Sequence, residues 1–567
     1  MTATLEAPGA PEAPTELEQP RHPVPAALVP WRDPNPRIGW FIVVALTAFA
    51  GITRFWALGF PKQKIFDEAY YPVEAQEILR YGYEDNRGYM FIVHPPLGKW
   101  LIAFGEWLAD DNKSDYLTNS FGWRIMPALF GCGTVIIVAR TARRLTRSNL
   151  FGGIAGLLIA CDGMSLVLAR TALLDVFLEF FIAAAFGAMV IDRDKVRARL
   201  AGLIADGADL SDGVPSLGPR PWRLVAGVCF GLADAVKWTA LAFFLVFIVL
   251  TVLWDRAALR AAGVSRPSRW TLRRSALPGL GSLIVAPFAA YLFCYLGWFA
   301  GENSWGRHYA DTASTHTHLN LPFGISVPWD WAFVPGPIRS LGAYTLQAYR
   351  FHQGLDSGHA YASNPWSWLV LGRPVDFYYQ GSPGTDCSAP CSKQVLLIGT
   401  PLLWWAFVPM LLWLAWHYLT TRDWRAGAIW VAFLAGWVFW FQNLKRTMFL
   451  FYMAPLVPFL IFGLVLAMGT ILGPVRAEGT ALFFGGDGLS GRPGRPRSWS
   501  DLGPWLADLT WRYPVARVGR RRAWGTAAIT VFLALVLVDF AWMFPIFTGG
   551  PLSNASWHAH MWLPSWI

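Results

Sequence analysis

The sequence lacks the local motifs that mark the commonest nucleotide-dependent and zinc-dependent enzymes. It contains no Walker-type glycine-rich loop and no His/Cys spacing typical of zinc ligands, so we expect no metal site. It also shows no internal repeat. Residues 1–37 contain no apolar stretch of the kind that a cleavable signal peptide requires, and we expect them to form a disordered cytoplasmic tail.

Hydrophobic residues, in contrast, dominate the chain. They make up 54% of its 567 residues, and the mean hydropathy is +0.36. A helix of roughly 20 apolar residues crosses a bilayer core about 30 Å thick. On this scale the sequence predicts an all-α polytopic membrane protein with about eleven spans, near 38–58, 122–139, 150–168, 172–191, 222–237, 238–254, 276–299, 395–419, 425–442, 448–472 and 523–545.

The basic residues of the loops predict the orientation of these spans. Groups of arginine and lysine follow the second, fourth, sixth, eighth and tenth spans, at 140–147, 193–199, 256–274, 422–425 and 476–522. No Lys or Arg follows residue 545. Because basic loops stay in the cytoplasm, this alternation predicts a cytoplasmic N-terminus and an outer C-terminus. The formal net charge of +10 is then a consequence of topology, and we expect no nucleic-acid partner.

This topology divides the chain into four regions. We expect a tail at 1–37, a catalytic transmembrane module at 38–299 with an outer loop at 59–121, an extracytoplasmic segment at 300–394, and a second transmembrane module at 395–567 with a cytoplasmic loop at 473–522. The segment 300–394 is rich in Trp, Tyr, Pro and Gly, which favours an ordered lid of short elements. Cys387 and Cys391 lie in it on the oxidising side, so they form either a small disulfide loop or two free thiols.

The first outer loop carries unusual charges. Asp67 and Glu68 are adjacent carboxylates shortly after the first span, and His94 and Lys99 flank a pair of prolines. After these prolines, apolar residues recur at helical spacing opposite Lys99 and Glu106, which predicts an amphipathic helix on the outer membrane face. The N-terminus of this helix could present Lys99 to an anion, and an anchoring helix without a ligand is the alternative.

Further charged residues fall at the outer ends of the predicted spans: Arg124, Asp162, Arg170, Asp175, Asp234, Lys237, Lys445, Arg446 and Asp539. Each alone is compatible with a structural ion pair, but together they predict a polar cavity open to the outer side. Arg and Lys can hold a phosphate leaving group, and a carboxylate can take a proton from a hydroxyl. The cavity is therefore equipped to transfer a group from a lipid phosphate to a hydroxyl.

At these residues the sequence resembles the protein O-mannosyltransferases, glycosyltransferases of the GT-C class. The matching stretches run in the family's order: Phe66-Asp67-Glu68, His94-Pro95-Pro96-Leu97-Gly98-Lys99, Trp123-Arg124-Ile125-Met126-Pro127, Ala169-Arg170-Thr171-Ala172-Leu173-Leu174-Asp175, Gly231-Leu232-Ala233 with Val236-Lys237-Trp238, Asn364-Pro365-Trp366-Ser367-Trp368, and Met561-Trp562-Leu563-Pro564-Ser565-Trp566. The segment 300–394 lacks the β-trefoil repeats of eukaryotic members, so the likeness is to actinobacterial ones.

The resemblance implies transfer of mannose from polyprenyl-phosphate-mannose to Ser/Thr hydroxyls of secreted proteins, with inversion, on the extracytoplasmic face of the plasma membrane. Carried over by motif, Asp67 is the expected general base, and Glu68 is expected to orient the site by pairing with a cation such as Arg124. The residues expected at the donor and its phosphate are Arg124, Lys237, Arg373, Lys99 and His94. Those expected to support the pocket are Arg170, Asp175 and Asp162.

The same resemblance implies no cofactor, leaves the need for a divalent metal open, and suggests partnership with the secretion translocon.

Three alternative functions would also place charged residues near the membrane. A GT-C transferase could move another lipid-linked sugar, or use a lipid or glycan acceptor. A transporter would instead place charges near the midplane, often with internal repeats, and a scaffold protein would leave the cost of so many charges unexplained.

Overall fold

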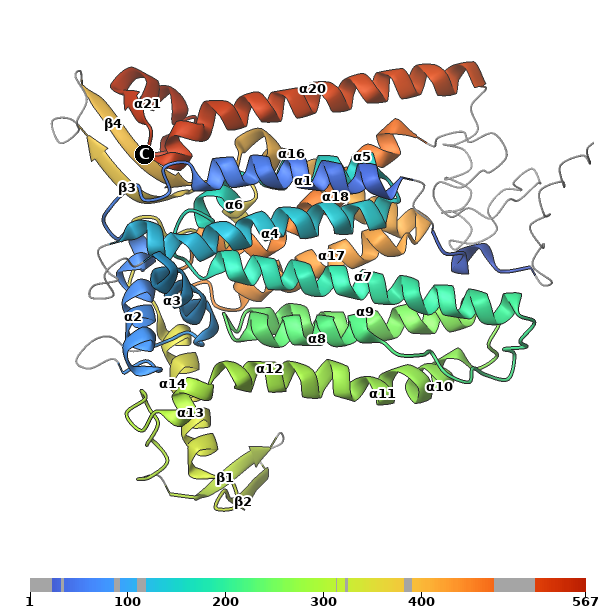
Figure 1. Cartoon of the computed structure of the whole chain (residues 1–567), viewed down its shortest axis with the longest axis horizontal. Helices are drawn as coiled ribbons and strands as arrows, with labels where there is room; N and C mark the ends of the chain where they lie inside the picture. Colours follow the sequence, from blue (N-terminus) through green and yellow to red (C-terminus); the bar gives the residue numbers. More distant parts are fainter. Residues whose placement is uncertain are drawn as a thin grey trace, which may run out of the picture.

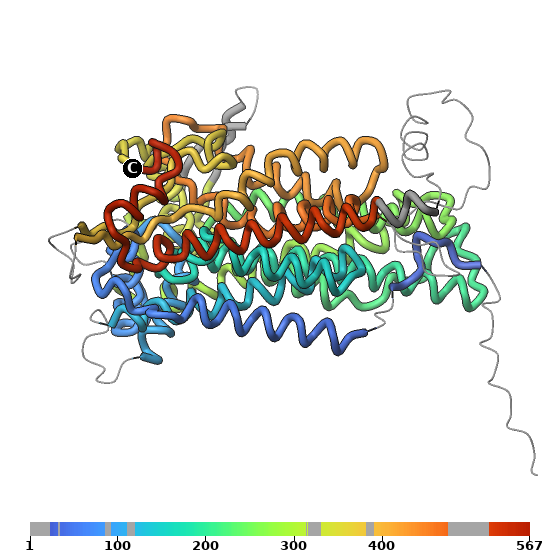
Figure 2. The backbone as a smooth tube through the Cα atoms, turned by 90° about the horizontal axis from the view of Figure 1, so that it is seen from above, coloured from blue at the N-terminus to red at the C-terminus, as the bar shows by residue number. Residues whose placement is uncertain are grey.

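A computed structural model gives the architecture of the chain as a bundle of long, roughly parallel helices with smaller elements at one end (Figures 1 and 2). It describes residues 23–31, 35–85, 92–109, 119–312, 314–321, 325–381, 390–473 and 515–567. Cys387 and most of the predicted loop 473–522 lie outside these residues. The predicted all-α membrane architecture is confirmed, whereas the division into four regions stays a prediction.

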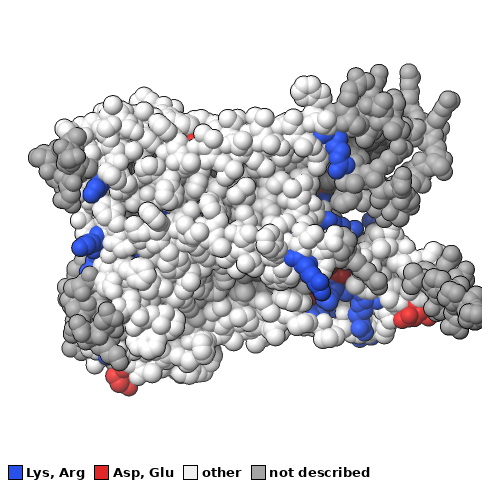
Figure 3. All heavy atoms as spheres, turned by 45° about the horizontal axis from the view of Figure 1, so that its top comes forward, with Lys and Arg blue, Asp and Glu red and all other residues white. Residues whose placement is uncertain are grey.

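Eight helices of the described part are long and apolar enough to cross a membrane. They are α1 (Pro36–Phe55), α4 (Ser120–Thr146), α9 (Ala240–Ala261), the segment Pro267–Cys294 that ends in α12 (Ala286–Cys294), α16 (Pro401–Thr421), the segment Trp424–Gln442 that begins with α17 (Trp424–Val438), the segment Leu450–Leu472 that contains η8 (Leu450–Leu456) and α18 (Val457–Leu472), and Arg521–Thr548 within α20 (Val515–Thr548). Few charged atoms appear over the middle of the bundle, and Lys and Arg gather at its ends (Figure 3).

Three further predicted spans are helical but fall short of these criteria by length or charge. The third is split into α5 (Asn149–Ala160) and α6 (Gly163–Leu168), with Asp162 capping α6 by accepting from Ser165 N. The fourth, α7 (Asp175–Ala205), contains acidic residues, and the fifth, α8 (Pro221–Asp234), has 14 residues. All pack within the bundle, α5 and α7 against α4 and α8 against α7. The count of eleven and the orientation remain predictions.

Close packing between α8 and α12 explains why two positions of α8 are glycine. Gly227 and Gly231 of α8 face η5 (Gly281–Val285) and the start of α12, where a side chain would collide with the carbonyl oxygen of Ser282 or Pro287 respectively. Small residues allow helix backbones to approach closely in a membrane, where apolar side chains gain little from burial. These two glycines therefore fix the distance between α8 and α12.

The smaller elements gather at one end of the bundle, on the left in Figure 1. They include α2 (Tyr71–Tyr81), α3 (Leu97–Ala109), α14 (Gly336–Gly354), α15 (Pro365–Trp368) and α21 (Asn554–His560). Two antiparallel sheets join them, one of β1 (His316–Leu321) and β2 (Ile325–Asp330), the other of β3 (Val375–Gly381), β4 (Cys391–Leu397) and β5 (Pro551–Ser553). Segment 300–394 thus contains short elements, as expected, together with the 19-residue α14. Cys391 is disulfide-bonded.

The predicted amphipathic helix is present as α3. Its apolar face is open, with Phe104, Trp107 and Leu108 each about half exposed, whereas Lys99 and Glu106 are buried against the protein. The helix therefore presents its apolar face outward, as a membrane-surface helix does. The interpretation that its N-terminus presents Lys99 to an anion gains no support, because the Lys99 side chain is 0% exposed.

The prediction of disorder throughout residues 1–37 is wrong for part of the tail. Residues 26–28 form η1 (Ala26–Leu28), and Leu28 is buried in an apolar cluster with Val196 and Leu259. The Arg197 guanidinium also donates to the Ala27 carbonyl at 2.7 Å. An apolar side chain and one hydrogen bond tie this short segment to the ends of α7 and α9. Residues 1–22 lie outside the described part.

Candidate active site

The centre of the site is the short helix η2 (Phe66–Ala69), which Glu68 anchors. The Glu68 carboxylate accepts from Arg124 Nε at 2.8 Å and Nη2 at 2.6 Å, and from the backbone N–H groups of Ile65 and Ala172 at 3.1 and 2.9 Å. Both charged side chains are 0% exposed. The predicted pairing of Glu68 with Arg124 is therefore present, and it fixes the backbone that carries Asp67.

The other contacts of Arg124 favour a structural role. Its remaining N–H groups donate to the carbonyl oxygens of Leu58, Pro61 and Gln63 at 3.2, 2.8 and 3.4 Å. A guanidinium has five N–H donors, and these contacts together with Glu68 take up its capacity. The geometry thus gives no support to the expectation that Arg124 binds a phosphate, and supports its role in holding the loop before η2.

Asp67, next to Glu68, points into a different environment. Tyr71 Oη lies 3.4 Å from its Oδ2, and Lys237 and Asp175 are its principal charged neighbours. Burial raises the pKa of Asp67 to about 6, although the positive charge of Lys237 acts to lower it. Lys237 Nζ also donates to Asp175 at 2.7 Å, which keeps the ammonium in place. A carboxylate of this pKa is well suited to accept a proton near neutral pH.

A basic and aromatic wall stands beside this pair. Lys237 Nζ lies 5.9 Å from the ring centroid of Tyr452, whose hydroxyl accepts from Arg446 Nη1 at 3.2 Å. Arg446 Nε donates to the His352 carbonyl at 3.0 Å, and the rings of His94 and His352 lie 5.0 Å apart. The structure therefore joins the predicted Lys237 and His94 with Arg446, His352 and Tyr452.

The two histidines of this wall are held neutral. Burial and the nearby positive charges lower the pKa of His94 well below its usual value, and burial lowers the pKa of His352 to about 4. His352 Nε2 lies 3.0 Å from the Val93 carbonyl, so it carries the proton in that contact. Neutral imidazoles can exchange hydrogen bonds with sugar hydroxyls without adding charge next to Lys237.

Sequence reasoning missed His352 and Tyr452 as site residues. His352 belongs to α14 and Tyr452 to η8, and neither stands in a stretch that resembles the family. Arg446 carried a signal, since it is a charge at the outer end of a predicted span, but no role was assigned to it. An aromatic residue in an apolar run and a histidine in a long loop give no signal before the fold places them together.

Several predicted donor residues brace the site instead of facing it. Lys99 forms ion pairs with Glu74, at 3.2 Å, and with Glu84, and it donates to the His94 carbonyl at 2.9 Å. It thereby ties the segment of His94 to α2, with a side chain that is 0% exposed. Contact of Lys99 with a phosphate has no support in this geometry.

Arg373 is bound elsewhere at the same end of the molecule. Its Nη1 donates to the backbone oxygens of Ser565 and Ile567 at 2.6 and 3.0 Å, and its Nε and Nη2 donate to the Ala360 carbonyl. Trp566 Nε1 in turn donates to the Leu371 carbonyl at 2.7 Å. Arg373 thus fastens the chain end to the segment 360–373, and the expectation of a phosphate contact gains no support.

The remaining predicted residues differ in how near they are to the site. Asp175 belongs to it through Lys237, as described above. Arg170 donates to the carbonyl oxygens at the end of α1, including those of Arg54 and Trp56 at 3.0 and 2.6 Å. Asp162 accepts from Trp404 Nε1 at 2.6 Å and so links α6 to α16. Arg170 and Asp162 satisfy helix ends, which otherwise leave polar groups unpaired.

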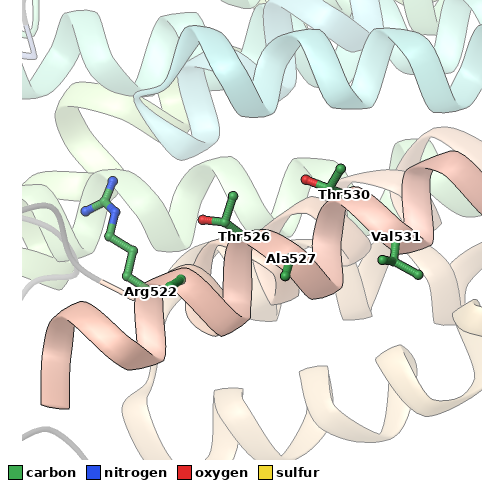
Figure 4. A pocket seen from close by; sticks show the side chains of 6 residues that line it. Arg522, Thr526, Ala527, Thr530 and Val531 are labelled. Carbon is green, nitrogen blue, oxygen red and sulfur yellow. The ribbon is translucent and has the colours of Figure 1, made fainter.

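Neither a surface hollow nor a group of metal ligands gives the described part of the chain a second candidate active site. A shallow hollow of about 690 Å³ runs along α20 and is lined by Arg522, Ala523, Thr526, Ala527, Thr530 and Val531 (Figure 4). It contains no carboxylate, and it is formed by one helix far along the chain from η2. Among the described residues, no three His, Cys, Asp or Glu side chains are gathered as ligands for a metal ion.

Comparison with known proteins identifies the family. The family model of dolichyl-phosphate-mannose-protein mannosyltransferases matches residues 44–300, and that of the C-terminal four-transmembrane region of protein O-mannosyltransferases matches residues 326–468. The chain is 38% identical to the polyprenol-phosphate-mannose–protein mannosyltransferase of Mycobacterium tuberculosis, over 97% of both chains, and 39% identical to that of Mycolicibacterium smegmatis, over 93% of both.

A solved structure has a similar fold. The Saccharomyces cerevisiae protein O-mannosyltransferase Pmt1–Pmt2 complex bound to the sugar donor matches with a TM-score of 0.65 and 16% identity, over 93% of this chain and 92% of that chain. This likeness confirms the predicted GT-C fold. Taken with the family models and the mycobacterial relatives, it leads to one assignment: the chain belongs to the protein O-mannosyltransferase family of membrane glycosyltransferases.

Proposed function

We propose that this protein transfers mannose from polyprenyl-phosphate-mannose to Ser/Thr hydroxyls of secreted proteins, with Asp67 as the general base. The names of the mycobacterial relatives support the donor and the protein acceptor. The observation that carries the role of Asp67 is its position beside Lys237, on a short helix that the buried Glu68–Arg124 pair holds in place. A proton acceptor and a phosphate-binding cation are thus neighbours.

The proposed reaction is a single displacement. An acceptor hydroxyl attacks the anomeric carbon of mannose while its proton passes to the Asp67 carboxylate. The bond from that carbon to the phosphate oxygen breaks, and the lipid phosphate leaves with the electron pair. Because the hydroxyl is far less acidic than a carboxylic acid, attack and proton transfer are concerted, and the anomeric configuration inverts.

Two cations of the basic wall stabilise the leaving phosphate in this proposal. Lys237 supplies a point charge beside Asp67, and Arg446 supplies a planar guanidinium beside His352. Charge develops on the phosphate as the bond breaks, so fixed cations lower the barrier more than they tighten binding of the donor. His94 and His352, both neutral, are placed to orient the sugar hydroxyls.

The reaction is proposed for the extracytoplasmic face of the plasma membrane. Arg124 and Arg144 lie on the same helix, α4, and their separation of 20 residues corresponds to about 30 Å, the thickness of a bilayer core. The site at η2 is at the end of α4 that carries Arg124, opposite the end rich in arginine. The positive-inside rule then puts η2 outside. Partnership with the secretion translocon stays a prediction.

The test is mannosyl transfer by the purified protein reconstituted with polyprenyl-phosphate-mannose and a Ser/Thr-rich peptide. We expect Asp67→Asn to lower the rate by about 10²–10⁴-fold, the usual contribution of a general base, while donor binding persists. The matched control is Asp311→Asn, which alters an exposed carboxylate in the same outer region and should leave transfer unchanged.

Two outcomes would contradict the proposal in different places. An Asp67→Asn variant that transfers mannose at the wild-type rate would remove the base role and leave the overall reaction standing. A folded wild type that hydrolyses the donor, or mannosylates a lipid or glycan but no peptide, would favour a GT-C transferase with another acceptor. Product stereochemistry, read by NMR of the mannosyl-peptide, tests inversion.

A further inference from the structure

A second cluster of charge lies at the opposite end of the bundle. Five arginines from the end of α4, the second half of α7 and the start of α17 converge there: Arg144, Arg147, Arg193, Arg197 and Arg425. Basic side chains are prominent at this end in Figure 3. The cluster has no part in the proposed chemistry, because it is about a bilayer thickness from Asp67 along α4.

The acidic groups that the described part of the chain brings into contact with the cluster are too few to neutralise it. Asp194 accepts from Arg144 Nη1 at 3.0 Å and from Arg193 Nη1 at 3.3 Å, and Asp423 binds Arg425 at 2.5 Å. Among the described residues, these two aspartates leave an excess of three positive charges. The nearby Asp192 and Asp255 are both engaged by Arg220. An anion would therefore be stabilised here.

Arg193 gives the cluster a buried and preorganised member. Its side chain is 8% exposed, and its guanidinium carbon lies 3.5 Å from the ring centroid of Trp424, which contacts Trp254 edge to face at 5.2 Å. Its Nε, like the Nε of Arg197, is buried without a hydrogen-bond partner in the described part of the chain. A buried unpaired donor is costly unless a ligand accepts from it.

The positive-inside rule alone does not explain this arrangement. That rule requires basic residues on the cytoplasmic side, and the exposed Arg269 and Arg273, at the start of the segment Pro267–Cys294, already supply such charge. It does not require arginines from three helices to converge, or one of them to be stacked and buried on tryptophan. A group of converging arginines, some of whose N–H groups have no acceptor in the described part of the chain, is typical of a site that binds an anion.

We propose that this cluster binds the phosphate of an anionic phospholipid in the leaflet facing it. A lipid is favoured over a soluble anion because the cluster lies at the membrane boundary, next to exposed apolar side chains such as Leu150 of α5 and Leu419 of α16, which are 57% and 63% exposed. Planar guanidinium groups bind phosphate oxygens in pairs, and tryptophan is favoured at this depth. The leaflet is the inner one under the predicted orientation, and the proposal does not depend on mannosyl transfer.

The test uses Arg147→Gln with Arg197→Gln, because neither arginine is in contact with an aspartate in the described structure. The control is Arg269→Gln with Arg273→Gln, which removes the same charge from the same side outside the cluster. Each purified protein, in neutral phosphatidylcholine nanodiscs, is titrated with phosphatidylglycerol, and bound lipid is counted by native mass spectrometry. Each arginine close to the phosphate of the bound lipid contributes about fivefold in affinity. The cluster variant should therefore bind the lipid about 30-fold more weakly, and the control variant, whose arginines lie outside the cluster, should bind it as the wild type does.

Three results would overturn the proposal. They are wild-type affinity in the cluster variant, an equal loss in the control variant, and binding of soluble glycerol 3-phosphate as tightly as the lipid, which would make this a soluble-anion site. If the double variant does not fold, the exposed Arg147→Gln alone should still weaken lipid binding by about fivefold, and unchanged binding would contradict the proposal. Mannosyl transfer in neutral membranes, measured in parallel, keeps this outcome separate from that of the proposed reaction.

Discussion

Replacing Glu68 with glutamine tests whether the buried ion pair, and not only its neighbour Asp67, is needed for the site. The carboxylate accepts hydrogen bonds from Arg124 and from the backbone N–H groups of Ile65 and Ala172, with no exposed surface. Glutamine keeps one acceptor and places an NH₂ group against donors. It also leaves the Arg124 guanidinium buried without its counter-charge. Breaking a buried pair in this way costs about 3–5 kcal/mol.

The loss should be felt in catalysis as well as in stability. Asp67 precedes Glu68 directly, so any relaxation of η2 moves the proposed base relative to Lys237. A misplacement of about 1 Å can lower a rate by about 100-fold. We therefore expect Glu68→Gln to lower kcat by about 100-fold, to change the KM for the donor little, and to lower the temperature of thermal unfolding.

Glu106→Gln is the matched control for this experiment. Glu106 is also a buried carboxylate at the outer end, 2% exposed, but neither of its oxygens has a hydrogen-bond partner among the described residues. Burial raises its pKa to about 9, so glutamine replaces a group that is already neutral. If Glu68→Gln proves as stable and as active as Glu106→Gln, the Glu68–Arg124 pair does not position Asp67, and the reasoning is refuted.

Three further predictions concern pH and the basic wall. The pKa of Asp67 is raised to about 6, and the base must be ionised. A pH profile of kcat/KM should therefore fall about tenfold per pH unit below pH 6. A flat profile between pH 5 and 7 would contradict the role of Asp67 as the base. Lys237→Gln and Arg446→Gln should each lower kcat/KM by about 10–100-fold through loss of a charged hydrogen bond to the phosphate, and an unchanged value in either variant would remove that residue from the donor site. Glu106 binds a proton in the folded state up to pH about 9 but only up to 4.5 when unfolded, so stability should fall as pH rises between these values. Glu106→Gln should abolish that fall in unfolding temperature, and a slope equal to the wild type's would show that another group causes it.

The sequence predicted the centre of the site better than its surroundings. Asp67, Glu68 and Arg124 could be placed together because the family resemblance implied that Glu68 pairs with a cation such as Arg124, a charge at the outer end of a predicted span. For Lys99 and Arg373 the resemblance implied contact with the donor phosphate, and for Arg170 it implied support of the pocket. The structure pairs them with carboxylates and carbonyl oxygens. A sequence reveals that a buried charge needs a partner, but not whether the partner is the protein or a substrate.

Some membrane spans could be predicted from local sequence, and others could not. Helices with a long apolar run were found from hydropathy alone, including α4 and α18. In α7 the acidic residues Asp175 and Glu179 interrupt the pattern, and they are paired inside the bundle with Lys237 and Ser165. At the break between α5 and α6, Asp162 accepts from Trp404, which is more than 200 residues away. Such features depend on long-range contacts, which no local window of sequence contains.

The adjacent carboxylates of η2 illustrate why one fold position can supply both rigidity and chemistry. In a tight helix, consecutive side chains point about 120° apart, so Glu68 can face Arg124 while Asp67 faces Tyr71 and Lys237. Glu68 is saturated by hydrogen bonds. Asp67 has one long contact with Tyr71, and burial raises its pKa. Glu68 is a fixed support because all its acceptor positions are used, and Asp67 can act as a base because burial leaves its carboxylate incompletely solvated.

A hydrophobic residue at position 68 could bury as much surface, and replacing a buried ion pair by apolar groups is often neutral for stability. It could not specify the direction of Arg124, whose guanidinium gathers the carbonyl oxygens of the loop 58–63 around η2. The Glu68–Arg124 pair therefore contributes to the choice of conformation more than to stability. It selects one arrangement of the loop around η2, and so sets where the proposed base meets its substrate.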